Sequence, residues 1–156
     1  MKILFLSTWI SVTSYASING RFYSEFKRNN MDCAIEATLS QKRANQITFK
    51  QWDELCEDNN GNTFESSLAD ITTYEKIGVN KLSVTQGNEK IELDAKVLEF
   101  NKDFVHYNFE LDTEDGHLEI DESYQLKGND LNFSSIFILD GKKIINKAGT
   151  IAKTRK

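Results

Sequence analysis

The second half of the chain shows a regular alternation of apolar and polar positions. Short alternating runs begin at Val79 and are separated by five turn-like segments: Gly87-Asn88, Asn101-Lys102-Asp103, Asp115-Gly116, Gly128-Asn129 and Asp140-Gly141. A period of two is typical of half-buried strands, and Gly and Asn favour the tight turns of hairpins. The pattern therefore predicts an antiparallel up-and-down meander of six strands, near residues 79–86, 89–100, 104–114, 117–127, 130–139 and 142–152.

The turns also predict the register, that is, which residues lie opposite each other across each hairpin. The expected partners are Tyr107 with Tyr124, Phe109 with Glu122, Tyr124 with Phe133, Glu122 with Ser135, Phe137 with Ile144, and Leu82 with Leu93. A slip of one residue would set these apolar side chains against charged ones, so the hydrophobic pattern supports this register. Across the three-residue loop at Asn101, Val97 is expected opposite Tyr107, although a β-bulge would also fit there.

One face of this predicted sheet is apolar and aromatic, whereas the other is hydrophilic. Six twisted strands with one apolar face must curl, close or be covered. One or two further strands from residues 33–77 could close a barrel of about eight strands. In architecture this resembles the lipocalin-like (calycin) barrels, although no signature motif of that family is present. We therefore expect a mainly β fold, a barrel or half-barrel. The alternative is an α+β fold with N-terminal helices packed on an open curved sheet.

The stretch before Val79 is harder to interpret. Phe22 and Phe26 are four residues apart, which fits a short amphipathic helix. Thr48 and Gln51 have the spacing of a capping box and so predict a helix start, but the alternation over residues 47–50 fits a strand equally well. The rest of this stretch has mixed periodicity, and both readings stay open.

The first sixteen residues have the layout of a secretory signal peptide. Lys2 is followed by the apolar run 3–10, and small residues precede a cleavage site after Ala16. A buried N-terminal strand is the alternative. The signal-peptide reading predicts a cleaved leader, 1–16, and a single β-rich domain, 17–156, located in the periplasm or outside the cell. No later apolar run has the roughly 20 residues of a membrane span, so no stable membrane insertion is expected.

Composition limits the partners. The chain has a net charge of −5 with its charges scattered along the sequence, which argues against nucleic-acid binding through phosphates.

The two cysteines of the chain, Cys33 and Cys56, form an even set, which in an exported protein predicts a disulfide bond. Two free buried thiols are the alternative, because the sequence does not show whether their side chains face each other.

The predicted register places three polar residues side by side on the apolar face. Glu122, Ser135 and Asn146 would be neighbours on three adjacent strands, with Tyr107 and Tyr124 flanking them. A buried carboxylate without partners is costly, so these groups should bind one another or a ligand. Apolar walls with a few convergent polar groups are typical of a small-molecule site. The alternative is a structural polar network or a row at the rim of the sheet.

A second candidate surface lies on the last two strands. Ile136, Ile138 and Ile145 interrupt the polar pattern expected on the outer face. Exposed together they would form an apolar patch of the kind that marks a protein partner. An N-terminal segment could equally cover them.

Motifs for catalysis or for metal binding are missing from the sequence. There is no Gly-x-Ser-x-Gly, His-Glu-x-x-His, phosphate loop or Cys-x-x-Cys, and His117 falls in a solvated hairpin turn. We therefore expect an exported, non-catalytic protein without metal or cofactor that binds a small apolar or lipid-like ligand. The alternative function is that of a periplasmic protein-binding inhibitor or immunity-type protein.

Overall fold

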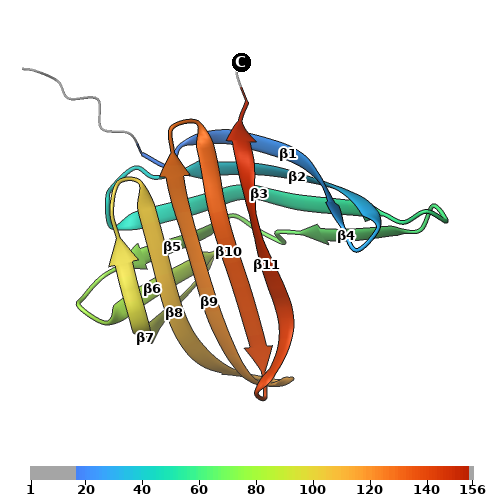
Figure 1. Cartoon of the computed structure of the whole chain (residues 1–156). Helices are drawn as coiled ribbons and strands as arrows, with labels where there is room; N and C mark the ends of the chain where they lie inside the picture. Colours follow the sequence, from blue (N-terminus) through green and yellow to red (C-terminus); the bar gives the residue numbers. More distant parts are fainter. Residues whose placement is uncertain (1–16, 155–156) are drawn as a thin grey trace, which may run out of the picture.

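The computed structural model describes residues 17–154, which form one antiparallel sheet of eleven strands and no helix (Figure 1). In chain order the strands are β1 (Gly20–Arg28), β2 (Met31–Ser40), β3 (Gln46–Glu57), β4 (Thr63–Ser67), β5 (Thr72–Lys76), β6 (Lys81–Gln86), β7 (Glu89–Phe100), β8 (Phe104–Thr113), β9 (Gly116–Lys127), β10 (Asp130–Leu139) and β11 (Lys142–Lys153). Ten of them close into a barrel, because β2, at one end of the strand order, also pairs with β3 near the other end. β4 is an additional strand beside β3. The lipocalin/calycin-like barrel expected from the sequence is therefore confirmed, with ten strands in place of about eight.

The predicted meander corresponds to β6–β11, and each of these strands pairs with the next along the chain. Gly128 and Gly141 lie in its turns with φ of 64° and 77°. This left-handed region is readily open to glycine, which explains why these two residues mark the hairpins so clearly. Between β9 and β10 the predicted register is confirmed, with Tyr124 opposite Phe133 and Glu122 opposite Ser135.

The predicted register between β8 and β9 was wrong by two residues. Tyr107 lies opposite Glu122, because the strands pair up to Thr113 and Gly116 and the turn is centred on Glu114-Asp115. A shift of two residues leaves every side chain on the same face of the sheet. Glu122 and Tyr124 consequently both point into the barrel, as expected.

Between β7 and β8 the pairing is irregular. Tyr107 lies opposite Leu98 and not Val97, because the ladder shifts between Ala95 and Val97. The bulge considered as an alternative at this joint is thus present. It allows both Ala95 and Leu98 to be buried in the core, although they are three positions apart along the strand.

Between β10 and β11 the register prediction was wrong by one residue. Phe137 lies opposite Ile145, and the ladder shifts next to this pair. An odd shift exchanges the two faces of a strand. Ser135 therefore lies opposite Lys147, where Asn146 was expected, and this exchange changes the chemistry of the barrel interior.

The N-terminal helices considered in the α+β alternative are not formed. Phe22 and Phe26 lie on β1, and Thr48 and Gln51 lie on β3. A spacing of four residues is also a multiple of two, so Phe22 and Phe26 face the interior from a strand as well as they would from a helix. Pairing with neighbouring strands decides between the two, as when Phe22 pairs with Ala37 of β2.

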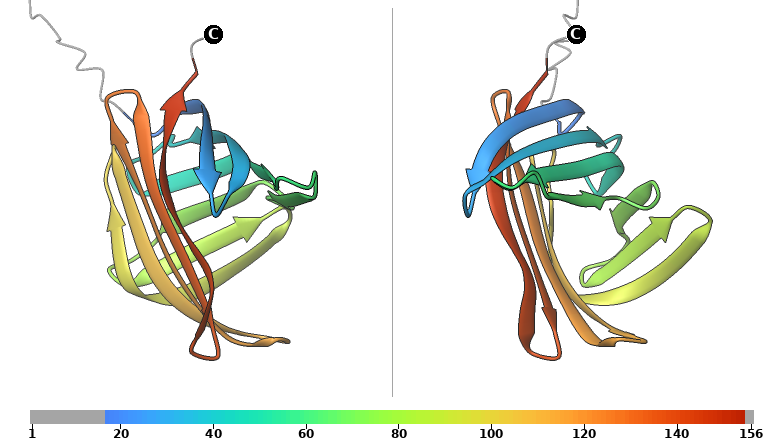
Figure 2. Two further views of the ribbon diagram at one scale, coloured as in Figure 1. Left: turned by 45° about the vertical axis from the view of Figure 1, so that its right-hand side comes forward. Right: turned by 90° about the vertical axis from the view of Figure 1, so that its right-hand side faces the viewer.

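The strands form a tall wall and a shorter one. Figures 1 and 2 show β8–β11 as the tall wall, with β1–β3 crossing its upper part and β5–β7 opposite its lower part; β4 projects beyond β11 beside the end of β3. β11 meets β1 only at Phe22 with Lys153 and Tyr23 with Ala152. β3 is long enough to pair with β5 along its first half and with β4 along its second half. The interior between the two walls holds the apolar core and the site described below.

The Cys33–Cys56 disulfide bond is present and joins residues that lie opposite each other on β2 and β3. No helix within residues 17–154 is long and apolar enough to cross a membrane. The predicted signal peptide, 1–16, lies outside the described residues.

Candidate functional site

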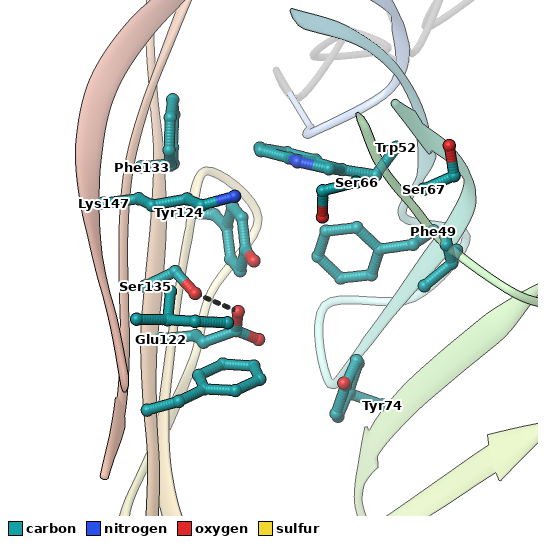
Figure 3. A pocket seen from close by; sticks show the side chains of 13 residues that line it. Phe49, Trp52, Ser66, Ser67, Tyr74, Glu122, Tyr124, Phe133, Ser135 and Lys147 are labelled. Atoms are coloured by element: carbon teal, nitrogen blue, oxygen red, sulfur yellow. Dashed lines mark hydrogen bonds between the residues drawn. The ribbon is translucent and has the colours of Figure 1, made fainter. Parts of the chain in front are cut away.

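The barrel interior contains a cavity of about 200 Å³ between β3–β5 on one side and β9–β11 on the other (Figure 3). Its walls are mainly aromatic and its polar groups are few. The aromatic lining residues are Phe49, Trp52, Tyr74, Tyr124, Phe133 and Phe137, and the polar ones are Ser66, Ser67, Glu122, Ser135 and Lys147. Apolar walls with a few placed polar groups are the usual composition of a small-molecule site.

The aromatic rings pack against one another across the two walls. Phe49 of β3 meets Tyr124 of β9 with ring centroids 4.9 Å apart, and Trp52 meets Phe133 of β10 at 5.1 Å, both edge to face. Phe49 also contacts Tyr74 of β5 at 5.8 Å. Such aromatic pairs stabilise by about 0.5–1.5 kcal/mol each beyond the area they bury. They hold the cavity walls in a defined shape.

Glu122 projects from the centre of β9 into this cavity, and only 8% of the residue is exposed. The Tyr107 hydroxyl donates a hydrogen bond to Oε2 at 2.6 Å, and the Ser135 hydroxyl donates one to Oε1 at 2.7 Å. Burial raises the pKa of Glu122, while hydrogen bonds from Tyr107, Ser135 and Tyr124 act in the opposite direction. Two of its neighbours follow from pairing: Tyr107 and Ser135 lie directly opposite Glu122 on the two adjacent strands.

The surrounding phenols are held neutral. Burial, and then the charge of Glu122, raise the pKa of Tyr107 and of Tyr124 well above the ordinary value. Tyr107 is fully buried and stacks on Tyr74 with ring centroids 4.4 Å apart. These tyrosines therefore act as fixed hydrogen-bond donors, with Tyr107 behind Glu122 and Tyr124 on the cavity wall.

A separate charged cluster borders the cavity above Ser135. Lys147 extends from β11 towards β3, and its Nζ lies 2.6 Å from Oε2 of Glu54 (Figure 3 shows the lysine). Arg28 of β1 forms an ion pair with the other oxygen of Glu54. Glu54 is buried, while Arg28 and Lys147 are each about three-quarters covered. This cluster ties β1, β3 and β11 together where β1 and β11 no longer pair.

The structure brings together four of the five residues predicted for the binding site. Glu122, Ser135 and Tyr124 line the cavity, and Tyr107 supports Glu122. The prediction for Asn146 was wrong: it lies opposite Ile136, on the other face of the sheet from Ser135. The register shift in β11 puts Lys147 in its place, and the hydrophobic pattern alone gave no signal for that shift.

The predicted isoleucine surface is not continuous. Ile136 and Ile138 lie on the outer face of β10 and are half-buried. Ile145, expected beside them, lines the interior cavity because of the same register shift. The patch that pointed to a protein partner therefore loses one of its three members to the barrel interior.

Sequence reasoning missed the contributions of the N-terminal half to the site. Phe49, Trp52 and Tyr74 reach the cavity from β3 and β5, and the tip of β4 adds Ser66 and Ser67. Phe49 and Trp52 are three residues apart and share the inner face because the β2–β3 ladder shifts between them. Which strands these residues face depends on closure of the barrel.

The two histidines are elsewhere on the molecule. His106 interacts with Asp121 at 3.0 Å, and His117 with Asp112 at 2.8 Å. Within residues 17–154 no group of three or more His, Cys, Asp or Glu side chains is placed to hold a metal ion.

Comparison of the chain with protein-family models, curated proteins and solved structures found no match.

Proposed function

We propose that this protein is an exported, non-catalytic binding protein that holds one small, mainly apolar molecule inside its barrel. The observation that carries the proposal is the interior cavity of about 200 Å³ that reaches the buried carboxylate of Glu122. A structural network alone would require only Tyr107, Ser135 and the carboxylate in contact. It would not require open space bounded by aromatic rings beside them.

The size of the cavity limits the ligand. An apolar cavity of about 150 Å³ accommodates benzene, whereas drug-sized molecules occupy about 300–1,000 Å³. The cavity here, at about 200 Å³, fits one ring with a short chain or an aliphatic group of similar bulk. Larger lipid-like molecules would require the cavity to widen.

The binding proposal can be tested with Trp52 as an internal reporter. In the proposed exported chain, which begins at Ser17, Trp52 on the cavity wall is the single tryptophan, because Trp9 lies in the predicted signal peptide. We expect titration with toluene to change its fluorescence saturably. Ser135→Leu should fill the cavity and abolish this response, whereas Ser134→Leu, on the opposite face of β10, should retain it. A response that survives Ser135→Leu unchanged would contradict binding in this cavity.

Export is supported by the disulfide bond and by the N-terminal sequence. Cys33 and Cys56 are joined by a disulfide bond, and such bonds persist in oxidising compartments and are rare in the cytosol. The intact mass of the protein recovered from its natural compartment should correspond to a chain beginning at Ser17. It should not increase on alkylation without reductant. Two alkylatable thiols in that sample would contradict export into an oxidising compartment.

A further inference from the structure

We propose that the ligand is an organic cation, with an ammonium group held by Glu122 and an apolar body held by the aromatic walls. This inference rests on the proposed function of the cavity and adds the chemical class of its occupant.

The first observation is an acidic group without a counter-charge. Glu122 is about nine-tenths buried and faces the cavity, and the hydrogen bonds that it accepts come from neutral hydroxyl groups. Among residues 17–154 no lysine, arginine or histidine forms an ion pair with it. A buried carboxylate is costly unless it is paired with a cation. A ligand ammonium in the cavity would supply that missing charge.

The second observation is that the basic groups nearby are already paired. Lys147 lines the cavity, but its Nζ is hydrogen-bonded to Glu54 at 2.6 Å, and Arg28 pairs with the same carboxylate. An anionic ligand would have to draw Lys147 away from a buried partner, Glu54, and would lie beside the acidic Glu122. The arrangement of interior charges therefore favours a cationic occupant over an anionic one.

The third observation is the nature of the walls. Trp52, Phe49 and Tyr124 are inclined to one another by 59–75°, so ring faces and edges both border the cavity. In Figure 3 Phe49, Trp52 and Tyr74 lie on the side opposite Glu122. The faces of Trp, Tyr and Phe attract cations, Trp most strongly. An ammonium close to Glu122 would thus have a carboxylate on one side and aromatic rings on the other.

The proposal can be tested by calorimetric titration of the full chain with three molecules of similar shape. These are 2-phenylethylamine, its neutral counterpart 2-phenylethanol, and the anion phenylacetate. We expect the amine to bind at least about tenfold more tightly than the alcohol, and phenylacetate to bind most weakly. The comparison uses the unmodified protein, so it does not depend on the folding of any variant.

Variants identify the residue responsible. Glu122→Gln should abolish the preference for the amine over the alcohol. The matched control Glu119→Gln, on the outer face of β9, should keep that preference. Equal binding of amine and alcohol, or tighter binding of phenylacetate, would overturn the cation proposal and leave the binding cavity in place. If neither these three molecules nor toluene binds, the proposed function fails as well.

Discussion

The hydrogen bond between Tyr107 and Glu122 offers a direct test of the buried polar site. Tyr107→Phe removes the hydroxyl that donates to Oε2 at 2.6 Å and keeps the ring that stacks on Tyr74. Hydrogen bonds to charged groups contribute about 1.5–3 kcal/mol, and removing one partner leaves the other buried and less well satisfied. We therefore expect the free energy of unfolding to fall by about 1.5–3 kcal/mol, or Tm to fall by about 5–10 °C.

The chain offers a matched control on its surface. Tyr23 also donates a hydrogen bond to a glutamate, Oε1 of Glu25, at the same distance of 2.6 Å, but 41% of Tyr23 is exposed. Tyr23→Phe should change the free energy of unfolding by no more than about 0.5 kcal/mol. Urea unfolding of the two variants beside the wild type measures both values. Equal losses in the two variants would refute the argument that burial makes the Tyr107 bond important.

The effect of Tyr107→Phe should also depend on pH. Burial raises the pKa of Glu122 above 4.5, and the Tyr107 hydroxyl opposes this rise by stabilising the anion. Below pH 4.5 Glu122 is protonated in both the folded and the unfolded state, and the bond then joins two neutral groups, contributing about 1 kcal/mol. The loss of stability should therefore be larger at about pH 8 than at about pH 4. A loss that is the same at both values would contradict an ionised Glu122.

Three further predictions use the same measurement. The free energy of unfolding of the wild type should decrease as pH rises from 4.5 through the raised pKa of folded Glu122, because within that window the carboxyl is protonated in the folded state and ionised in the unfolded state. Glu122→Gln should remove this decrease, and a variant with the same slope would contradict the prediction. Reduction of Cys33–Cys56, which closes a segment of 23 residues, should cost about 3 kcal/mol, and an unchanged urea midpoint with dithiothreitol would contradict it. Glu54→Gln should lower the free energy of unfolding by roughly 3 kcal/mol, because it leaves Arg28 and Lys147 without their buried partner. Glu36→Gln, in an exposed pair with Arg21, should lower it by less than about 1 kcal/mol, and similar losses in the two variants would disprove the role of burial.

The local pattern of the sequence determined the β-rich second half of the molecule. Alternation with a period of two and turns such as Gly128-Asn129 predicted β6–β11, and they placed Glu122, Tyr124 and Ser135 on one face. For β8–β10 this worked because a tight hairpin links residues that are close in the chain, so that local information fixes both the strands and their facing side. The cysteine pairing was likewise predicted from the even set of two cysteines, and Cys33–Cys56 is bonded.

Closure of the barrel and the irregular pairings were decided by tertiary structure. The spacing of Phe22 and Phe26 fits a helix as well as a strand, and only pairing of β1 with β2 and β11 selects the strand. The position of Lys147 depends on a shift of one residue between β10 and β11, which turns Asn146 outward and Ile145 inward. Such a shift is a compromise among contacts with distant strands, including the bond of Lys147 to Glu54, 93 residues away along the chain. Contacts between residues so far apart leave no local pattern in the sequence, so only the folded barrel shows which side chains of β11 face inward.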